Sequence, residues 1–265
     1  MTFREIVGFR LVTAEPERLS RFYRDIGFDV GASELMTSAE IDLLGLSGGG
    51  VRIPMSLGES RVALECYDRP GRPYPADTSA CDLVFQHFAL VTGDAAAAWE
   101  QALGAGATPI SRGGPVKLPE AVGGVTAVKF RDPEGHPLEL LQFPPGSARG
   151  GGTGRRIDHS AIAVADVASS RQFYRRHGLR EAAATVNHGP TQDRLDGLAN
   201  VLVDVVPMSP RHGTSHVELL GYRNPTARAS GPLAANDIGA TRIVWRSDDL
   251  GLVRDPDGHL HQLTP

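Results

Sequence analysis

The sequence contains little cysteine, few aromatic residues and no long apolar run. Its two cysteines, Cys66 and Cys81, are too few for a disulfide framework, so a reducing cytoplasm is the expected compartment. No apolar stretch approaches the roughly 20 residues that a membrane-spanning helix needs. The first ten residues carry charges instead of the apolar segment of a secretory signal. We therefore expect no membrane partner.

The chain also lacks an excess of basic residues. Its formal net charge is −4, and charged residues make up 22% of it without a basic stripe, which argues against nucleic acid as a partner. The 265 residues, 41% of them hydrophobic, are enough for one or two cores. The remaining expectation is a protein that binds a small molecule as a monomer or homodimer.

Four segments of the chain open in the same way, which indicates an internal repeat. Each is a short apolar and β-branched run that ends in an acidic residue, the pattern of a strand followed by a turn or by the first residue of a helix. The four segments span residues 8–15, 87–94, 159–166 and 241–248.

Three of these strands are followed by helical patterns. Phe22 and Tyr23 after the first strand match Phe173 and Tyr174 after the third, and Trp99 follows the second. Aromatic residues at helical spacing are typical of a helix face packed against a sheet. We interpret them as core residues with no cofactor role.

The modules also end alike, in a strand with a carboxylate or an amide. Modules two and four share the sequence Arg-Asp-Pro-(Glu/Asp)-Gly-His, in which proline and glycine predict a turn between two strands. Module four is too short for a helix and a middle strand, so it is expected to be truncated. The final strands carry Glu65, Glu139, Glu218 and Gln262 in modules one to four.

These patterns predict an α+β fold of tandem βαβββ modules paired into two cupped mixed sheets. The predicted modules span residues 1–80, 81–147, 156–230 and 231–265, with a glycine-rich linker at 148–155. If neighbouring modules pair, the first domain covers residues 1–147 and the second covers residues 156–265.

This arrangement resembles the glyoxalase/bleomycin-resistance/extradiol-dioxygenase group, the vicinal-oxygen-chelate (VOC) superfamily. The most specific segment is Val-Thr-Ala-Val-Lys-Phe-Arg-Asp-Pro-Glu-Gly-His-Pro-Leu-Glu-Leu at 125–140, preceded by Gly-Pro-Val-Lys at 114–117. It looks like the second module of a bacterial glyoxalase I. The resemblance implies that two modules form a cup around a divalent metal (Fe, Mn, Ni, Co or Zn) held by their first and last strands. Chemistry in this superfamily ranges from lyases and isomerases to ring-cleaving dioxygenases, and other members only sequester drugs, so fold leaves function open.

Mapped onto the first domain, the resemblance places Gly8, Glu65, His87 and Glu139 at the ligand positions. Gly8 cannot bind a metal, whereas one imidazole and two carboxylates form a plausible ligand set. The predicted metal ligands are therefore Glu65, His87 and Glu139. Glu65 and Glu139 are also the candidates for a general base.

Three further residues are predicted to meet the substrate. Arg10 shares a strand face with Gly8, and Tyr67 shares one with Glu65. Arg10 is expected to bind an anionic group of the substrate, and Tyr67 to orient it. Lys117 lies in a loop that can cover the mouth of the cup.

The second domain keeps fewer candidate ligands. The corresponding positions are His159, Glu218, Thr241 and Gln262, of which His159 and Glu218 are strong ligands. We interpret this half as a degenerate or metal-free remnant.

The predicted function is that of a metal-dependent lyase or isomerase acting on a small oxygen-rich molecule, enolisable or catechol-like, in the first domain. Three alternatives stay open: a non-catalytic binder of a drug or metabolite, an extradiol-type dioxygenase, and a metal-free enzyme that uses acid–base chemistry alone.

Overall fold

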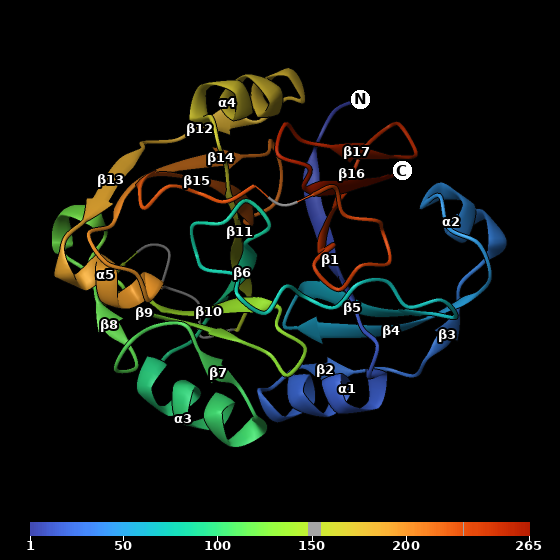
Figure 1. The fold of residues 1–265 in the computed structure, drawn as a ribbon, viewed down its shortest axis with the longest axis horizontal. Helices are drawn as coiled ribbons and strands as arrows, with labels where there is room; N and C mark the ends of the chain where they lie inside the picture. Colours follow the sequence, from blue (N-terminus) through green and yellow to red (C-terminus); the bar gives the residue numbers. More distant parts are fainter. Residues whose placement is uncertain (148–154, 230) are drawn as a thin grey trace.

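Two mixed β-sheets and a few short helices form the chain (Figure 1). The structure is a computed structural model that describes residues 1–147, 155–229 and 231–265. The predicted linker at 148–155 therefore lies outside the described residues except for Arg155. Within the described ranges, no helix is both long and apolar enough to cross a membrane.

One sheet combines the two ends of the chain. Its strands from module one are β1 (Glu5–Val12), β2 (Asp29–Val30), β3 (Glu34–Leu35), β4 (Gly50–Leu57) and β5 (Ser60–Tyr67). Module four adds β16 (Arg242–Arg246), β17 (Gly251–Arg254) and β18 (Leu260–Thr264). The strand order is β17-β18-β16-β1-β5-β4-β2, with β3 also paired to β4. We call its concave side the terminal cup.

The other sheet combines the two central modules. Module two supplies β6 (Gln86–Val91), β7 (Thr108–Pro109), β8 (Val116–Lys117), β9 (Thr126–Arg131) and β10 (Pro137–Gln142). Module three supplies β11 (Ile157–Ala163), β12 (Arg180–Glu181), β13 (Thr185–His188), β14 (Leu202–Ser209) and β15 (His216–Asn224). The order is β12-β14-β15-β11-β6-β10-β9-β7, with β13 on β14 and β8 on β9. We call its concave side the central cup.

The helices that follow the first strands of modules one to three begin where the sequence predicts. Asp94 and Asp166 each accept hydrogen bonds from two backbone N–H groups of the first turn, which satisfies donors that a helix start leaves unpaired. Glu15 makes no such bond, and Pro16 begins that helix instead. The helices are α1 (Pro16–Asp25), α2 (Ser38–Leu43), α3 (Ala95–Ala105), α4 (Val167–Arg176), α5 (Pro190–Asp196) and the 3₁₀ turn η1 (Glu120–Val122).

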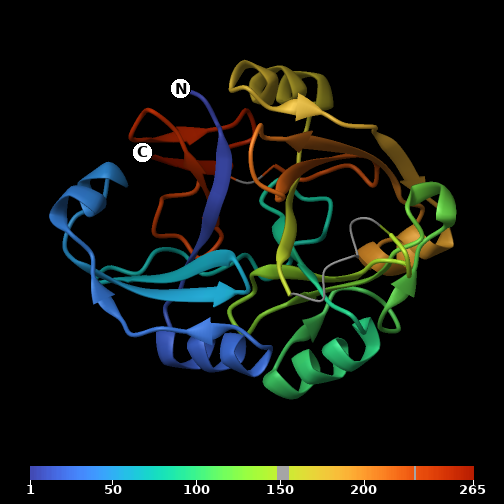
Figure 2. The same ribbon diagram turned by 180° about the vertical axis from the view of Figure 1, so that it is seen from behind.

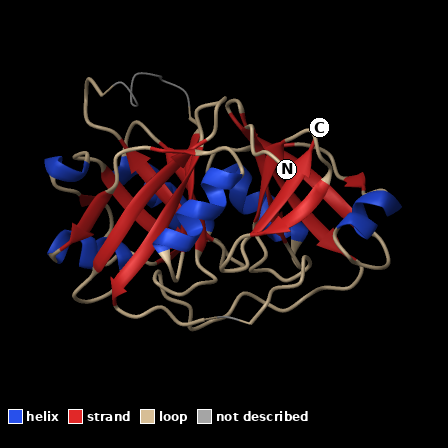
Figure 3. Cartoon of the chain, turned by 90° about the horizontal axis from the view of Figure 1, so that it is seen from above, coloured by secondary structure: helices blue, strands red, loops and turns tan. Residues whose placement is uncertain are grey.

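The main core lies between the two sheets, on the side opposite to both cups. Alternating strand residues project there, and the ring of Phe9 on β1 stacks 5.4 Å from that of Phe88 on β6. The predicted core aromatics Phe22, Tyr23 and Tyr174 are buried in the same cluster. Figure 3 shows the two sheets on either side of the central helices, and in Figures 1 and 2 α1 and α3 lie side by side. The two cups therefore open away from each other.

The modules pair in a different order from the predicted one. The first strand of module one, β1, is antiparallel to β16 of module four, and β6 of module two is antiparallel to β11 of module three. Every module exposes the same kind of strand edge, so local sequence does not decide which edges meet. The predicted cup of modules one and two is therefore wrong, while the α+β class and the two cupped sheets are confirmed.

Candidate functional site

The central cup brings together four residues from matching places in modules two and three. His87 lies on β6 and Glu139 on the last strand of module two, whereas His159 lies on β11 and Glu218 on the last strand of module three. Their positions in the paired strands place all four side chains on the concave face. Two imidazoles and two carboxylates thus converge where the modules meet.

The distances between these side chains are short. His87 Nε2 lies 3.3 Å from Glu139 Oε2, and His159 Nε2 lies 3.5 Å from the same oxygen. His159 Nε2 is also 3.6 Å from Glu218 Oε2. One ligand atom each from His87, Glu139 and His159 falls within a mutual distance of 4.8 Å, and all three residues are buried. One ion can therefore contact these atoms after only small side-chain movements.

His87 supports a metal at this place most directly. Both its ring nitrogens are buried, and neither has a hydrogen-bond partner of good geometry among the described residues. A buried polar atom without a partner is unfavourable by about 1–3 kcal/mol, and coordination of a cation by Nε2 would remove one such defect. A set of two nitrogens and two carboxylate oxygens suits Zn, Ni, Co, Fe or Mn. The residues present therefore fit a divalent metal.

His159 is oriented by a neighbouring carboxylate. Its Nδ1 lies 3.0 Å from Asp158 Oδ2, which directs Nε2 towards the ligand carboxylates. The pairing of β11 shifts register between Ile157 and His159, a β-bulge that interrupts the usual alternation beside Asp158. A carboxylate behind a histidine ligand fixes its tautomer and raises its basicity. Sequence reasoning missed this role of Asp158.

Charges at this centre favour a cation. Burial would lower the pKa of His159, but the charges of Glu218 and Asp158 and a contact with Glu139 raise it to about 10. Burial would raise the pKa of Glu218, but His159 and His216 lower it to about 2. The pKa of Glu139 is held below its usual range by His159 and His87 despite burial. Burial lowers the pKa of His87, a shift towards the neutral form that metal coordination needs.

A cavity of about 360 Å³ lies directly above the four residues. This is enough space for a small organic molecule. Lys117 is not part of its lining: the side chain is 64% exposed and pairs with Glu120 at 3.3 Å. The wall is largely apolar with a few polar groups, and includes Leu118, Val125, Leu141, Phe143, Val203, Leu220, Lys129, Asn187, Gln192 and Tyr222.

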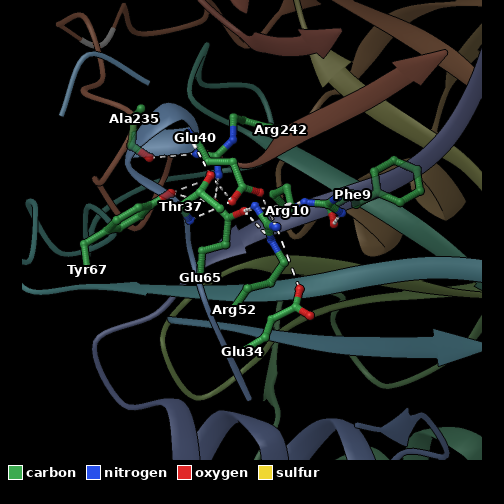
Figure 4. Close-up of polar contacts among 10 residues, drawn as sticks. All are labelled: Phe9, Arg10, Glu34, Thr37, Glu40, Arg52, Glu65, Tyr67, Ala235 and Arg242. Carbon is green, nitrogen blue, oxygen red and sulfur yellow. Dashed lines mark hydrogen bonds and ion pairs between the residues drawn. The ribbon is translucent and has the colours of Figure 1, made fainter. Parts of the chain in front are cut away.

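Glu65 lies in the terminal cup, on the other sheet from His87 and Glu139. Its carboxylate is fully buried and accepts hydrogen bonds from Arg242, Arg52 and the hydroxyl of Tyr67, the last at 2.5 Å (Figure 4). Arg10 Nε lies 3.5 Å from the same carboxylate. Three guanidinium groups thus surround this carboxylate. The structure does not bring Glu65 together with His87 and Glu139, and Arg10 and Tyr67 lie apart from the central cup.

The strand register of the central sheet shows where the four candidate ligands lie relative to one another, and the same relations can be looked for in the terminal sheet. His87 is opposite Ala161, and Ala89, two residues further on, is opposite His159 and beside Glu139. His87 thus faces the residue two positions after His159, and His159 faces the residue two positions after His87. Glu139 lies beside Ala89, two positions after His87 in the same module. Glu218 lies beside Ala161, two positions after His159 in the same module.

The same rule applied to the terminal sheet gives no ligand set. Gly8 is opposite Val244, and Arg10 is opposite Arg242, so Arg242 takes the place that the sequence assigned to Thr241. Ala63 lies beside Arg10, so Ala63 and not Glu65 matches Glu139. The four equivalent positions are Gly8, Ala63, Arg242 and Gln262.

The terminal cup is also filled by its own chain. Met36, Ile41 and Leu44, from α2 and the residues beside it, pack with Tyr67 and Ile238 in one buried cluster. The terminal cup, which holds the predicted site residues Glu65, Arg10 and Tyr67, is therefore a core with an internal ion-pair network. His159 and Glu218, which were predicted to be a remnant, are half of the candidate site. The available signal was that modules two and three each keep both ligand residues.

Solved structures with the same fold are found across the whole chain. Maize (Zea mays) glyoxalase I has a TM-score of 0.62 at 13% identity over 98% of this chain and 92% of that one, and its V278E mutant has a TM-score of 0.65 at 14% identity with the same coverage. The "putative dioxygenase" of Bacillus subtilis has a TM-score of 0.59 at 13% identity, over 99% and 85% of the two chains. Neither a protein-family model nor a curated protein matches the sequence. The fold expected from the repeat is thus confirmed: the chain has the fold of glyoxalase I.

Proposed function

We propose that this protein is a metal-dependent lyase or isomerase whose active site is the central cup. The observation that carries the proposal is the convergence of His87, Glu139, His159 and Glu218, in which neither ring nitrogen of the buried His87 has a hydrogen bond of good geometry within the described part of the chain. The substrate class is a small molecule with two neighbouring oxygens. A cavity of about 360 Å³ above the four residues supports a substrate of this size.

The four residues would hold the ion. When bound, a divalent metal supplies Lewis-acid stabilisation for negative charge on a substrate oxygen. The cavity wall shields the site from water, which strengthens every charge interaction inside it. Asp158 keeps the Nε2 atom of His159 directed at the carboxylates.

Glu218 is the better candidate for the base that moves a proton. Its side chain is 17% exposed, against 7% for Glu139, so it is the carboxylate more open to a substrate. Glu218 Oε1 lies 3.3 Å from His216 Nε2. A proton taken from carbon by Glu218 can therefore pass to His216. This assignment replaces Glu65, whose oxygens are occupied by arginines and Tyr67.

The test is the metal content of protein purified without an affinity tag, measured by mass spectrometry. We expect about one metal ion per chain in the wild type and its loss in the His87→Ala/His159→Ala double variant. Glu65→Gln is the matched control, because it removes a buried carboxylate from the other cup and should keep the metal. Absence of metal after incubation with Mn, Fe, Co, Ni and Zn would refute the proposal.

Chemistry is then tested on the loaded protein. We expect it to exchange a carbon-bound hydrogen of small hydroxyketones or hydroxyacids with deuterium from D₂O, as followed by NMR. Glu218→Gln should abolish the exchange. Oxygen uptake with catechols would instead indicate an extradiol-type dioxygenase, and tight ligand binding without any exchange would indicate a binder.

A further inference from the structure

Lys129 is a buried cation in the wall of the central cup. It lies on β9 directly opposite Glu139 on β10, and its side chain is only 5% exposed. Cross-strand neighbours project from the same face of a sheet, so Lys129 extends into the cup beside a candidate metal ligand. Its side chain is part of the cavity lining.

Asp196 at the end of α5 holds this ammonium group. Lys129 Nζ donates to Asp196 Oδ1 at 2.6 Å, while Asp196 Oδ2 accepts from Gln192 Nε2 at 2.8 Å and from the Tyr222 hydroxyl at 3.0 Å. The carboxylate is thus satisfied on both oxygens. A lysine ammonium has three N–H donors, and Asp196 is its single acceptor among the described residues. Two donors therefore remain for a molecule in the cavity.

Anchoring of α5 does not require this ion pair. Ser111 Oγ donates to the carbonyl of Leu195 at 2.7 Å, and the backbone N–H of Arg112 donates to the carbonyl of Arg194 at 2.8 Å. These bonds already fix the end of the helix to the sheet. Burying two charges is unfavourable unless further interactions compensate, so a buried pair contributes little to stability by itself.

The pair places positive charge towards the cavity. Lys129 belongs to the lining of the cavity whereas Asp196 does not, so the lysine is the member of the pair that borders the cavity. The carboxylate of Asp196 lies within hydrogen-bond distance of this ammonium group and supplies its counter-charge.

We propose that Lys129, positioned by Asp196, recognises a carboxylate, so that the central cup selects 2-hydroxy or 2-oxo carboxylates over neutral hydroxyketones. The inference rests on the proposed function, because the second oxygen of such a substrate would face the four candidate ligands. Lys129 supplies two free N–H donors and a positive charge, and a charge-assisted hydrogen bond to a carboxylate is about twice as strong as a neutral one.

The experiment compares lactate with hydroxyacetone, which share a three-carbon skeleton and adjacent oxygens but differ in charge. Binding to cobalt-loaded protein is followed by the visible absorption of Co²⁺. We expect Lys129→Met to weaken lactate binding about 10- to 100-fold and hydroxyacetone binding less than about threefold. Lys129→Arg should restore part of the lactate affinity, and Lys117→Met, an exposed lysine outside the cavity, should change neither.

Lys129→Met leaves Asp196 buried without its cation, so the Lys129→Met/Asp196→Asn double variant repeats the comparison if the single variant does not fold. Equal effects on the two probes, or no effect on lactate, would overturn the role of Lys129 while the metal site stands. A wild-type protein that binds no cobalt would overturn both proposals. Measuring the cobalt content therefore distinguishes failure of the proposed metal site from failure of the proposed role of Lys129.

Discussion

Replacing Glu65 by glutamine tests whether the terminal cup is a structural core. The substitution keeps the shape of the side chain and removes its charge. Arg52 retains Glu40 at 2.6 Å, whereas Arg242 is fully buried and, among the described residues, keeps the carbonyl of Ala235 and the Tyr67 hydroxyl as its acceptors. The main consequence is therefore one buried guanidinium without a counter-charge.

The expected loss follows from that unpaired charge. Burial and the positive charges of Arg10 and Arg52 lower the pKa of Arg242 to about 9, and Glu65 is the carboxylate that forms an ion pair with it. Removing one partner of a buried ion pair lowers the free energy of unfolding by about 3–5 kcal/mol. In a chain of this size the Tm should fall by about 10 °C.

Urea unfolding measures the free energy, and metal content is measured on the same protein. We expect Glu65→Gln to be destabilised yet to keep its metal. The Glu65→Gln/Arg242→Met double variant should lose less stability than the sum of the single variants, because it leaves no unpaired charge. Unchanged stability, or loss of metal in Glu65→Gln, would refute the structural role of this cup.

Three other predictions concern residues outside the ligand set. Burial lowers the pKa of His261 from 6.5 to about 3, so its contribution to stability is complete above pH 6.5 and is lost as the pH falls towards 3. The free energy of unfolding measured in urea should therefore fall by about 2–3 kcal/mol between pH 7.5 and 4.5. His261→Gln should flatten that dependence, and an unchanged slope would contradict it. Asp158→Asn should lower metal affinity about 10- to 100-fold in a competition titration, whereas no change would remove its orienting role. Lys117→Ala should leave ligand affinity in the cobalt assay within about twofold, since a solvated lysine contributes little.

The sequence by itself determined the local structure of each module. The capping residues Asp94 and Asp166 and the turn at 131–136 have the predicted conformations, and Gly135 adopts the positive φ of 100° that the turn needs. Caps and turns are set by residues a few positions apart, so they can be derived from sequence. His87, Glu139, His159 and Glu218 could also be picked out from the sequence, because each lies at the same place within its own module.

Tertiary structure alone decided which modules share a cup. The first strands of all four modules offer similar edges, and only the pairing of β6 with β11 joins His87 and Glu139 to His159 and Glu218. Register then decided that Ala63 takes the place expected for Glu65, because a shift of two residues keeps the side chain on the same face. The contact between Lys129 and Asp196 likewise joins residues from different modules. Such contacts depend on strand pairing between distant segments, which no local pattern in the sequence specifies.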